Sequence, residues 1–235
     1  MKMKQGIYAM VALAGMALMG VQGAFADTTV VYKMTSRDGS GTQTIYYRDK
    51  QHVRMDMANG AAGNSMTMLK LGDKVYMING KTVQDLDQLK QMMAMMGRGG
   101  SSHRSSADPI RYEDTGRTET IAGLTGKVYR FKDRDRMDRG KWHEAVLAKN
   151  KDLQNAVVAS VQMFAVMPAG MGGSSPSNRV QEDASIKSVA LLRMDHVLRL
   201  QSMRNHRISN SKFTLPAKPQ QLGGLGGALN GLLGH

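Results

Sequence analysis

Apolar and polar side chains alternate along the first part of the chain, between residues 27 and 79, as they do in β-strands with one buried face. Val30, Tyr32 and Met34 share one face of the first such segment. The strands predicted by this alternation cover residues 29–35, 42–48, 53–57, 66–71 and 74–78. Short turns separate them, and Asn79-Gly80 is a strong hairpin signal. Strands that follow one another so closely predict an antiparallel meander.

The hydrophobic period then changes to three and four residues, which predicts amphipathic helices over 85–96 and 153–167. The alternation returns between and after these helices. The further strands predicted cover residues 110–114, 117–121, 126–131, 142–148, 189–194 and 197–204. The last two form a hairpin that turns at Asp195-His196, although a helix over 184–194 fits the pattern of that stretch as well. The segment 213–216, Phe-Thr-Leu-Pro, closes the domain.

The first 26 residues have the layout of a secretory signal peptide. Lys2 and Lys4 precede an apolar stretch over 7–21, and Ala24-Phe25-Ala26 is a small-x-small cleavage site. The apolar stretch is short for a membrane span. We therefore expect cleavage after Ala26, leaving a periplasmic or secreted protein without a transmembrane segment.

The last 16 residues have a different composition. Leu residues recur there at helical spacing, but Gly residues are interspersed among them, and each Gly costs a helix about 1 kcal/mol relative to Ala. We expect a disordered tail, and an apolar peptide that orders against a membrane or a partner is the alternative. The predicted organisation is a signal peptide over 1–26, one domain over 27–219 and the Gly/Leu-rich tail over 220–235.

Several segments of the predicted strands carry a resemblance to a known group of proteins. They are Val-Val-Tyr-Lys-Met at 30–34, Arg-Met-Asp at 54–56, Lys-Val-Tyr-Met-Ile at 74–78, Thr-Glu-Thr-Ile-Ala-Gly at 118–123 with Lys-Val-Tyr-Arg at 127–130, and Phe-Thr-Leu-Pro at 213–216. Together these segments resemble a family of exported bacterial proteins of unknown function that is related to the LolA/LolB-like periplasmic lipoprotein carriers. The resemblance covers about residues 28 to 219.

The resemblance implies a mainly β fold of the α+β class: a single curved antiparallel sheet, or half-barrel, covered by one or two helices. It also implies a concave face lined by apolar side chains that could hold acyl chains. It carries over no catalytic residue, because the matching motifs are structural. The Met-rich helix with the loop after it, and the Gly/Leu-rich tail, are not parts of the family's pattern.

Composition narrows the class of partner. The chain has 32 Lys and Arg residues against 19 Asp and Glu, a formal net charge of +13, and loss of Lys2 and Lys4 with the signal peptide leaves +11. This charge favours anionic partners such as lipid headgroups or acidic envelope proteins, and export makes nucleic acid the least expected partner. There is no Cys, so disulfides do not stabilise the fold.

Methionine is unusually frequent, with 21 residues in the chain against one Trp. Its flexible thioether suits cavities that accept varied apolar ligands, and it is also an ordinary filler of protein cores. The candidates for a ligand cavity are Met34, Val53, Met55, Met57, Met66, Met68, Met77, Met92, Met93, Met96 and Trp142. The candidates for an anionic headgroup at its rim are Arg98, Arg104, Arg111 and Arg117.

The motifs of enzymes and metal sites are missing from the sequence. No two of its six His residues have the spacing of a zinc site, and the Gly-rich stretches have no phosphate-loop Lys. The acidic run from Asp133 to Gly140 departs from a calcium loop in spacing and contains three Arg residues. We therefore predict no catalytic residue, no cofactor and no resident metal.

The function expected from these patterns is a periplasmic, non-enzymatic binding protein that holds a lipid or acyl group in a Met-lined concave cavity. Two other functions remain open. The first is a structural module that docks on an envelope protein or an anionic membrane surface through the basic face and the tail. The second is binding of Cu(I) by Met residues, for which Met92, Met93, Met95 and Met96 are the only cluster.

Overall fold

The computed structural model describes residues 26–36, 39–59, 65–95, 110–132, 140–167, 180–181, 183–184 and 188–220. Its regular elements are eleven β-strands, two α-helices and a short 3-10 helix. In chain order they are β1 (Thr28–Ser36), β2 (Gly39–Asp49), β3 (His52–Asn59), β4 (Ser65–Leu71), β5 (Lys74–Asn79), β6 (Thr82–Asp85), α1 (Leu86–Met95), β7 (Glu113–Ile121), β8 (Leu124–Lys132), β9 (Trp142–Ala148), α2 (Lys151–Ala165), β10 (Ala190–Met194), β11 (Leu198–Asn205) and η1 (Asn210–Phe213).

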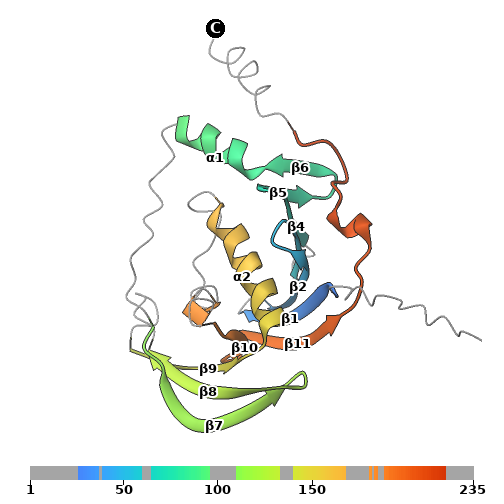
Figure 1. The fold of residues 1–235 in the computed structure, drawn as a ribbon. Helices are drawn as coiled ribbons and strands as arrows, with labels where there is room; N and C mark the ends of the chain where they lie inside the picture. Colours follow the sequence, from blue (N-terminus) through green and yellow to red (C-terminus); the bar gives the residue numbers. More distant parts are fainter. Residues whose placement is uncertain are drawn as a thin grey trace, which may run out of the picture.

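All eleven strands form one antiparallel sheet in the order β6-β5-β4-β3-β2-β1-β11-β10-β9-β8-β7. Strands β1 to β6 form one meander and β7 to β11 a second, and the pairing of β1 with β11 joins the two. The sheet is strongly curved and does not close, because β6 and β7 remain as its two edges (Figure 1). The prediction of a curved antiparallel half-barrel with helices is confirmed.

The two helices lie on the concave side of the sheet (Figure 1). Helix α2 crosses the middle of this side and contacts β1, β2, β3 and β10, whereas α1 contacts β5 and β6 near one edge. The side-chain oxygen of Asn150 caps α2 by accepting a hydrogen bond from the backbone N–H of Leu153, at 2.9 Å. The buried positions of α2 include Ala156, Ala159 and Ser160, and such small side chains let the helix approach the sheet closely.

The sheet has a hydrophobic core on each side. The larger core lies between the concave face and α2, and it contains Val30, Met55 and Leu153. The smaller core lies on the convex face over β4 to β6, where residues 206–220, which we call the C-terminal strap, cover Leu69 and Ile78. Ile208 and Phe213 are the buried side chains of the strap. The strap runs along the outside of the sheet (Figure 1), and the N–H of its last residue donates a hydrogen bond to the backbone oxygen of Val83 on the edge strand, at 2.8 Å.

Three elements differ from the sequence-based expectations. Strand β6 was not expected, and Asp85, the predicted first residue of the helix, is its last residue and caps α1 by accepting from the N–H of Asp87 at 3.0 Å. The two strands predicted over 110–114 and 117–121 are one strand, β7, whose register shifts around Gly116. The segment 213–216 is not a strand, because Phe213 ends the 3-10 helix.

Candidate functional site

The register of the sheet places the strand methionines in rows across the concave face. Residues that pair across antiparallel strands share a face, and Met55 pairs with Met68, Met68 with Met77, and Met57 with Met66. All five pack in the core that also contains the buried face of α2. The register therefore places these five side chains on one face of the sheet.

The predicted cavity residues on the concave face differ in how far they are buried. Val53, Met55 and Met68 are completely buried. The half-buried side chains are Met34, Met57, Met66, Met77 and Met92. The concave face thus has a closed floor beneath α2 and, around it, thioethers that solvent or a ligand can still reach.

A shallow hollow of about 160 Å³ lies on the same face at the β5–β6 edge. It is lined by Met77, Asn79, Thr82 and Gln84, and the register pairs Met77 with Gln84 and Asn79 with Thr82. The hollow has a thioether as its floor and amides and a hydroxyl at its rim. This combination suits an apolar group that carries a polar end.

The buried polar groups on this face are engaged in holding the fold. The hydroxyl of Tyr32 donates to the backbone oxygen of Leu191 at 2.7 Å, and burial raises the pKa of this hydroxyl far above its ordinary value. The side-chain amide nitrogen of Gln43 donates to the thioether sulfur of Met55 at 2.9 Å. Neither group is available to transfer a proton.

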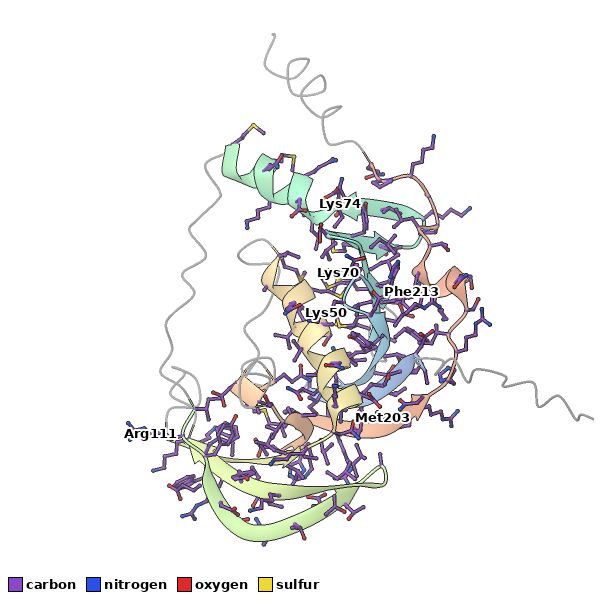
Figure 2. The ribbon with its side chains drawn as sticks, in the orientation of Figure 1. Lys50, Lys70, Lys74, Arg111, Met203 and Phe213 are labelled. Carbon is purple, nitrogen blue, oxygen red and sulfur yellow. The ribbon has the colours of Figure 1, made fainter. Side chains whose placement is uncertain are left out.

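Lys70 also lies on this face, and the sequence-based candidates did not include it. It pairs with Val53 on β3 and with Val75 on β5, and both neighbours belong to the concave core. Figure 2 shows Lys70 on the side of β4 that faces α2 and Phe213 on the opposite side, under the strap. The signal for Lys70 was present in the sequence, because Met66, Met68 and Lys70 occupy alternate positions.

Trp142 and the arginine candidates are not gathered at this site. Trp142, at the start of β9, is 48% exposed and lies 4.5 Å from the guanidinium of Arg130 and 4.6 Å from the ammonium of Lys132, measured to the ring centroid. Arg111 is exposed, and Arg117 is held in an ion pair by Glu144. Arg98, Arg104 and Met96 lie outside the described residues, as does the side chain of Met93.

The methionine cluster considered for Cu(I) is split in the part that the structure describes. Met92 packs against the core, whereas Met95 is 84% exposed. Among the described residues no group of three or more His, Asp or Glu side chains is arranged to hold a metal ion. No helix in this part of the chain is long and apolar enough to span a bilayer.

His143 and Asp195 form an additional close pair of titratable groups. The Nδ1 atom of His143 lies 2.6 Å from Oδ2 of Asp195, whose other oxygen accepts from the N–H of Glu144 at 2.7 Å. The ring stacks on Phe131, and its Nε2 atom is buried without a hydrogen-bond partner in the described structure. This pair connects β9 to the β10–β11 turn.

No family model and no curated protein matches the sequence. Among solved structures, the chain is similar to a LolA superfamily protein from Nitrosomonas europaea, with 11% identity, a TM-score of 0.29 and coverage of 80% of this chain and 90% of that one. It is also similar to a domain described as an outer membrane lipoprotein-sorting protein from Vibrio parahaemolyticus, with 11% identity, a TM-score of 0.27 and coverage of 81% and 90%. The first carries the name of the superfamily that the strand segments resemble. TM-scores this low leave the superpositions loose, so function has to be inferred from this chain's own geometry.

Proposed function

We propose that this chain is an exported, non-enzymatic binding protein that holds the acyl part of a lipid or lipidated ligand on the methionine-lined concave face of its sheet. The observation that carries the proposal is the graded burial of the cross-strand methionines. Met55 and Met68 form a closed floor, and Met57, Met66 and Met77 beside them stay half-buried. Apolar surface of this kind, on the inside of an unclosed sheet, is available for a ligand to cover.

Methionine supports a flexible apolar ligand better than other core residues do. Its unbranched side chain has three rotatable bonds and a polarisable sulfur, so it can follow the shape of an acyl chain at low cost. The nearby hollow at Met77 adds polar groups from Asn79, Thr82 and Gln84 at the edge of the apolar surface. An elongated ligand with one polar end fits this arrangement.

The polar groups of the site support binding without a reaction. In the described part of the concave face, the hydroxyl of Tyr32 and the amide of Gln43 are used in buried hydrogen bonds. The described acid–imidazole pair, His143 with Asp195, lies in the β9–β10 region, where Phe131 covers the ring. The proposal therefore places binding, without chemistry, at this site.

The experiment has two parts. The protein is first purified from the periplasm without detergent and weighed by native mass spectrometry before and after organic extraction. The extracted protein is then titrated with the neutral fluorescent probe N-phenyl-1-naphthylamine and with acyl competitors. We expect an extractable mass that matches a lipid, and a polypeptide mass equal to that of a chain beginning at Asp27. We also expect acyl chains to displace the probe.

Two matched variants locate the binding surface. Met77→Asp places a charge among the half-buried thioethers of the concave face. It should weaken probe binding at least about tenfold, because an ionised carboxylate must be desolvated there. Met95→Asp makes the same substitution at a position that is 84% exposed on α1 and should leave binding unchanged. If neither a bound lipid nor binding of the neutral probe is found, or if both variants bind as the wild type does, the proposal is wrong.

A further inference from the structure

One cation on the concave face differs from every comparable cation in the described structure. Lys and Arg side chains are half-buried at five described positions, namely Arg48, Arg54, Lys70, Arg193 and Lys212. Arg48, Arg54 and Arg193 each form an ion pair with a carboxylate, at 2.8 to 3.2 Å. Lys212 donates to the hydroxyl of Tyr46 at 3.4 Å and lies over its ring. The side chain of Lys70 makes no ion pair, hydrogen bond or ring contact with a described residue.

The position of Lys70 is defined by the register of three strands. Lys70 lies between Val53 of β3 and Val75 of β5, and both are buried in the concave core. On its own strand, Met68 and, before it, Met66 precede Lys70 on the same face. Lys70 is half-buried as a residue, and its ammonium has no carboxylate partner among the described residues, so a bound anion would supply the counter-ion.

We infer that Lys70 binds the acidic headgroup of the ligand, so that the protein selects amphiphiles that combine an acyl chain with a carboxylate or a phosphate. This inference rests on the proposed function, because it assigns the polar end of the same ligand. With the head at Lys70, the chain runs along β4 over Met68 and Met66. The four residue-to-residue steps from Lys70 to Met66 span about 13 Å of strand.

The path along β4 requires one local change. Met68 is completely buried and lies between Lys70 and the half-buried Met66. Its thioether moves aside by rotation about its side-chain bonds, which an unbranched side chain does without moving the backbone. The half-buried Met57, opposite Met66, and Met77, opposite Met68, then continue the apolar track.

Of the arginines proposed from the sequence, the two that the structure describes do not provide an equivalent group. Arg117 is already paired with Glu144, on the surface formed by the second meander. Arg111 is exposed just before β7, outside the rows of concave side chains on β1 to β6. Lys70 differs from both arginines, because β4 places it on the same face as Met66 and Met68.

The test compares competitors that share one chain and differ only in the head. Dodecanoate, dodecyl phosphate and the neutral dodecanol are used to displace N-phenyl-1-naphthylamine from the extracted protein. We expect the two anions to bind at least about tenfold more tightly than dodecanol, because a hydrogen bond between charged groups in a partly dry site is strong. The stronger of the two anions identifies the headgroup as carboxylate or phosphate.

Variants at position 70 test the assignment. Lys70→Gln should reduce the preference for anions to less than about twofold while dodecanol binding is unchanged, and Lys70→Arg should retain most of the preference. Lys33→Gln is the matched control, because Lys33 is exposed and alternates with Tyr32 and Met34, so that it lies on the convex side of β1. Circular dichroism and thermal unfolding establish that each variant is folded.

The outcomes separate this inference from the function on which it rests. If none of the three competitors displaces the probe, the acyl-binding function itself fails. If dodecanol competes as well as the anions, or if Lys70→Gln and Lys33→Gln reduce the preference equally, acyl binding stands and the role of Lys70 is wrong. In that case Lys70 only extends its ammonium to water over an apolar stem.

Discussion

The carboxylate of Glu119, on the edge strand β7, lies 3.0 Å from the guanidinium of Arg199 on β11, although three strands separate β7 from β11 in the sheet. The same carboxylate pairs with Arg193 on β10 at 2.9 Å, and Arg193 also pairs with Glu144 on β9 at 3.3 Å. These contacts require the second meander to curl until its edge approaches the middle of the sheet. The ion pairs therefore hold the edge strand β7 close to β10 and β11, on the face of the sheet that also carries Lys33.

The first prediction concerns the stability of this cluster at low pH. Burial tends to raise the pKa of Glu119, but hydrogen bonds from Arg193 and Arg199 outweigh it and hold the pKa below its ordinary value. A hydrogen bond from Arg117 is the main cause that lowers the pKa of Glu144. Both carboxyls therefore stabilise the fold fully above the unfolded pKa of about 4.3, and that contribution is lost as the pH falls through the lowered folded values.

Glu119→Gln should lower the free energy of unfolding at pH 7 by about 1 kcal/mol, a modest value because the pairs are partly exposed. It should also make the loss of stability between pH 5 and pH 3 shallower than in the wild type. Urea denaturation at several pH values measures both effects. Asp73→Asn, in an exposed turn, is the control and should change neither. If Glu119→Gln loses stability between pH 5 and pH 3 as steeply as the wild type does, the Glu119 carboxylate does not stabilise the fold in this way.

The second prediction concerns Gly126, which pairs with Glu119 across the β7–β8 hairpin. A Cβ atom at this position would lie 2.8 Å from both the backbone oxygen of Leu147 and a methyl carbon of Val146. Gly126→Ala should therefore cost about 1–3 kcal/mol of stability, as overpacking does, and should weaken the contact of Glu119 with Arg193. Chemical denaturation measures the loss.

The control for this variant is a glycine that is needed for a different reason. Gly72 has open space around its Cβ position and a φ of +62°, a conformation that Asn tolerates. Gly72→Asn should cost less than about 1 kcal/mol. Equal stability of Gly126→Ala and the wild type would show that β8 and β9 can separate at this point without loss, which would contradict the prediction.

The strands were predictable from the sequence because alternation is a local signal, and the structure confirms it from Val30 on β1 to the β10–β11 hairpin. Three features were not. Strand β6 has four residues, too few to establish a period. The pairing of β1 with β11 joins segments about 170 residues apart in sequence, which no local pattern encodes. The strap has no periodicity, since it is held by single side chains such as Phe213.

The candidate site was predictable to a similar extent. Alternation placed Met55, Met57, Met66 and Met68 on one face, and pairing across strands confirms that they share it. Their division into a buried floor and a half-buried margin depends on where α2 crosses, which the helical period does not specify. Trp142, at the start of β9, is 48% exposed and does not join the buried methionines. That the methionines bind a ligand stays a prediction.

The third prediction concerns Asp27, which fastens the C-terminal strap to the start of β1. One carboxylate oxygen of Asp27 accepts from the N–H of Ile208 at 2.8 Å and from the guanidinium of Arg48 at 3.2 Å, and the side chain is only 9% exposed. Asp27→Ala leaves these donors unpaired and should cost about 2 kcal/mol. It should also speed tryptic cleavage within the strap, for example after Lys212.

The control for the strap is Asn210, whose side-chain oxygen accepts an exposed hydrogen bond from Arg48 at 2.9 Å. Asn210→Ala should cost less than about 1 kcal/mol and leave the rate of cleavage nearly unchanged. If Asp27→Ala resists trypsin as the wild type does, the strap is held by Phe213 and Ile208 alone, and the assignment of Asp27 as its anchor fails.

The last prediction separates two methionines that are equally buried. Met55 and Met68 are both 0% exposed and pair directly across β3 and β4, so replacing either with Leu should cost the same if only packing mattered. They differ in one contact, since the sulfur of Met55 accepts a hydrogen bond from the amide of Gln43. Met55→Leu removes that acceptor from a buried donor, and it should be less stable than Met68→Leu by about 1 kcal/mol.

The double variant identifies the cause of this difference. Gln43→Leu combined with Met55→Leu removes donor and acceptor together, and the pair should be more stable than the sum of the two single changes, by about 1 kcal/mol. Urea denaturation of the four proteins in the cycle measures this coupling. Equal costs for Met55→Leu and Met68→Leu, with no coupling to Gln43, would mean that the thioether acts through its shape alone. A measured coupling would show that the closed floor is held in one arrangement by a polar contact, which leaves Met57, Met66 and Met77 as the thioethers free to adapt to a ligand.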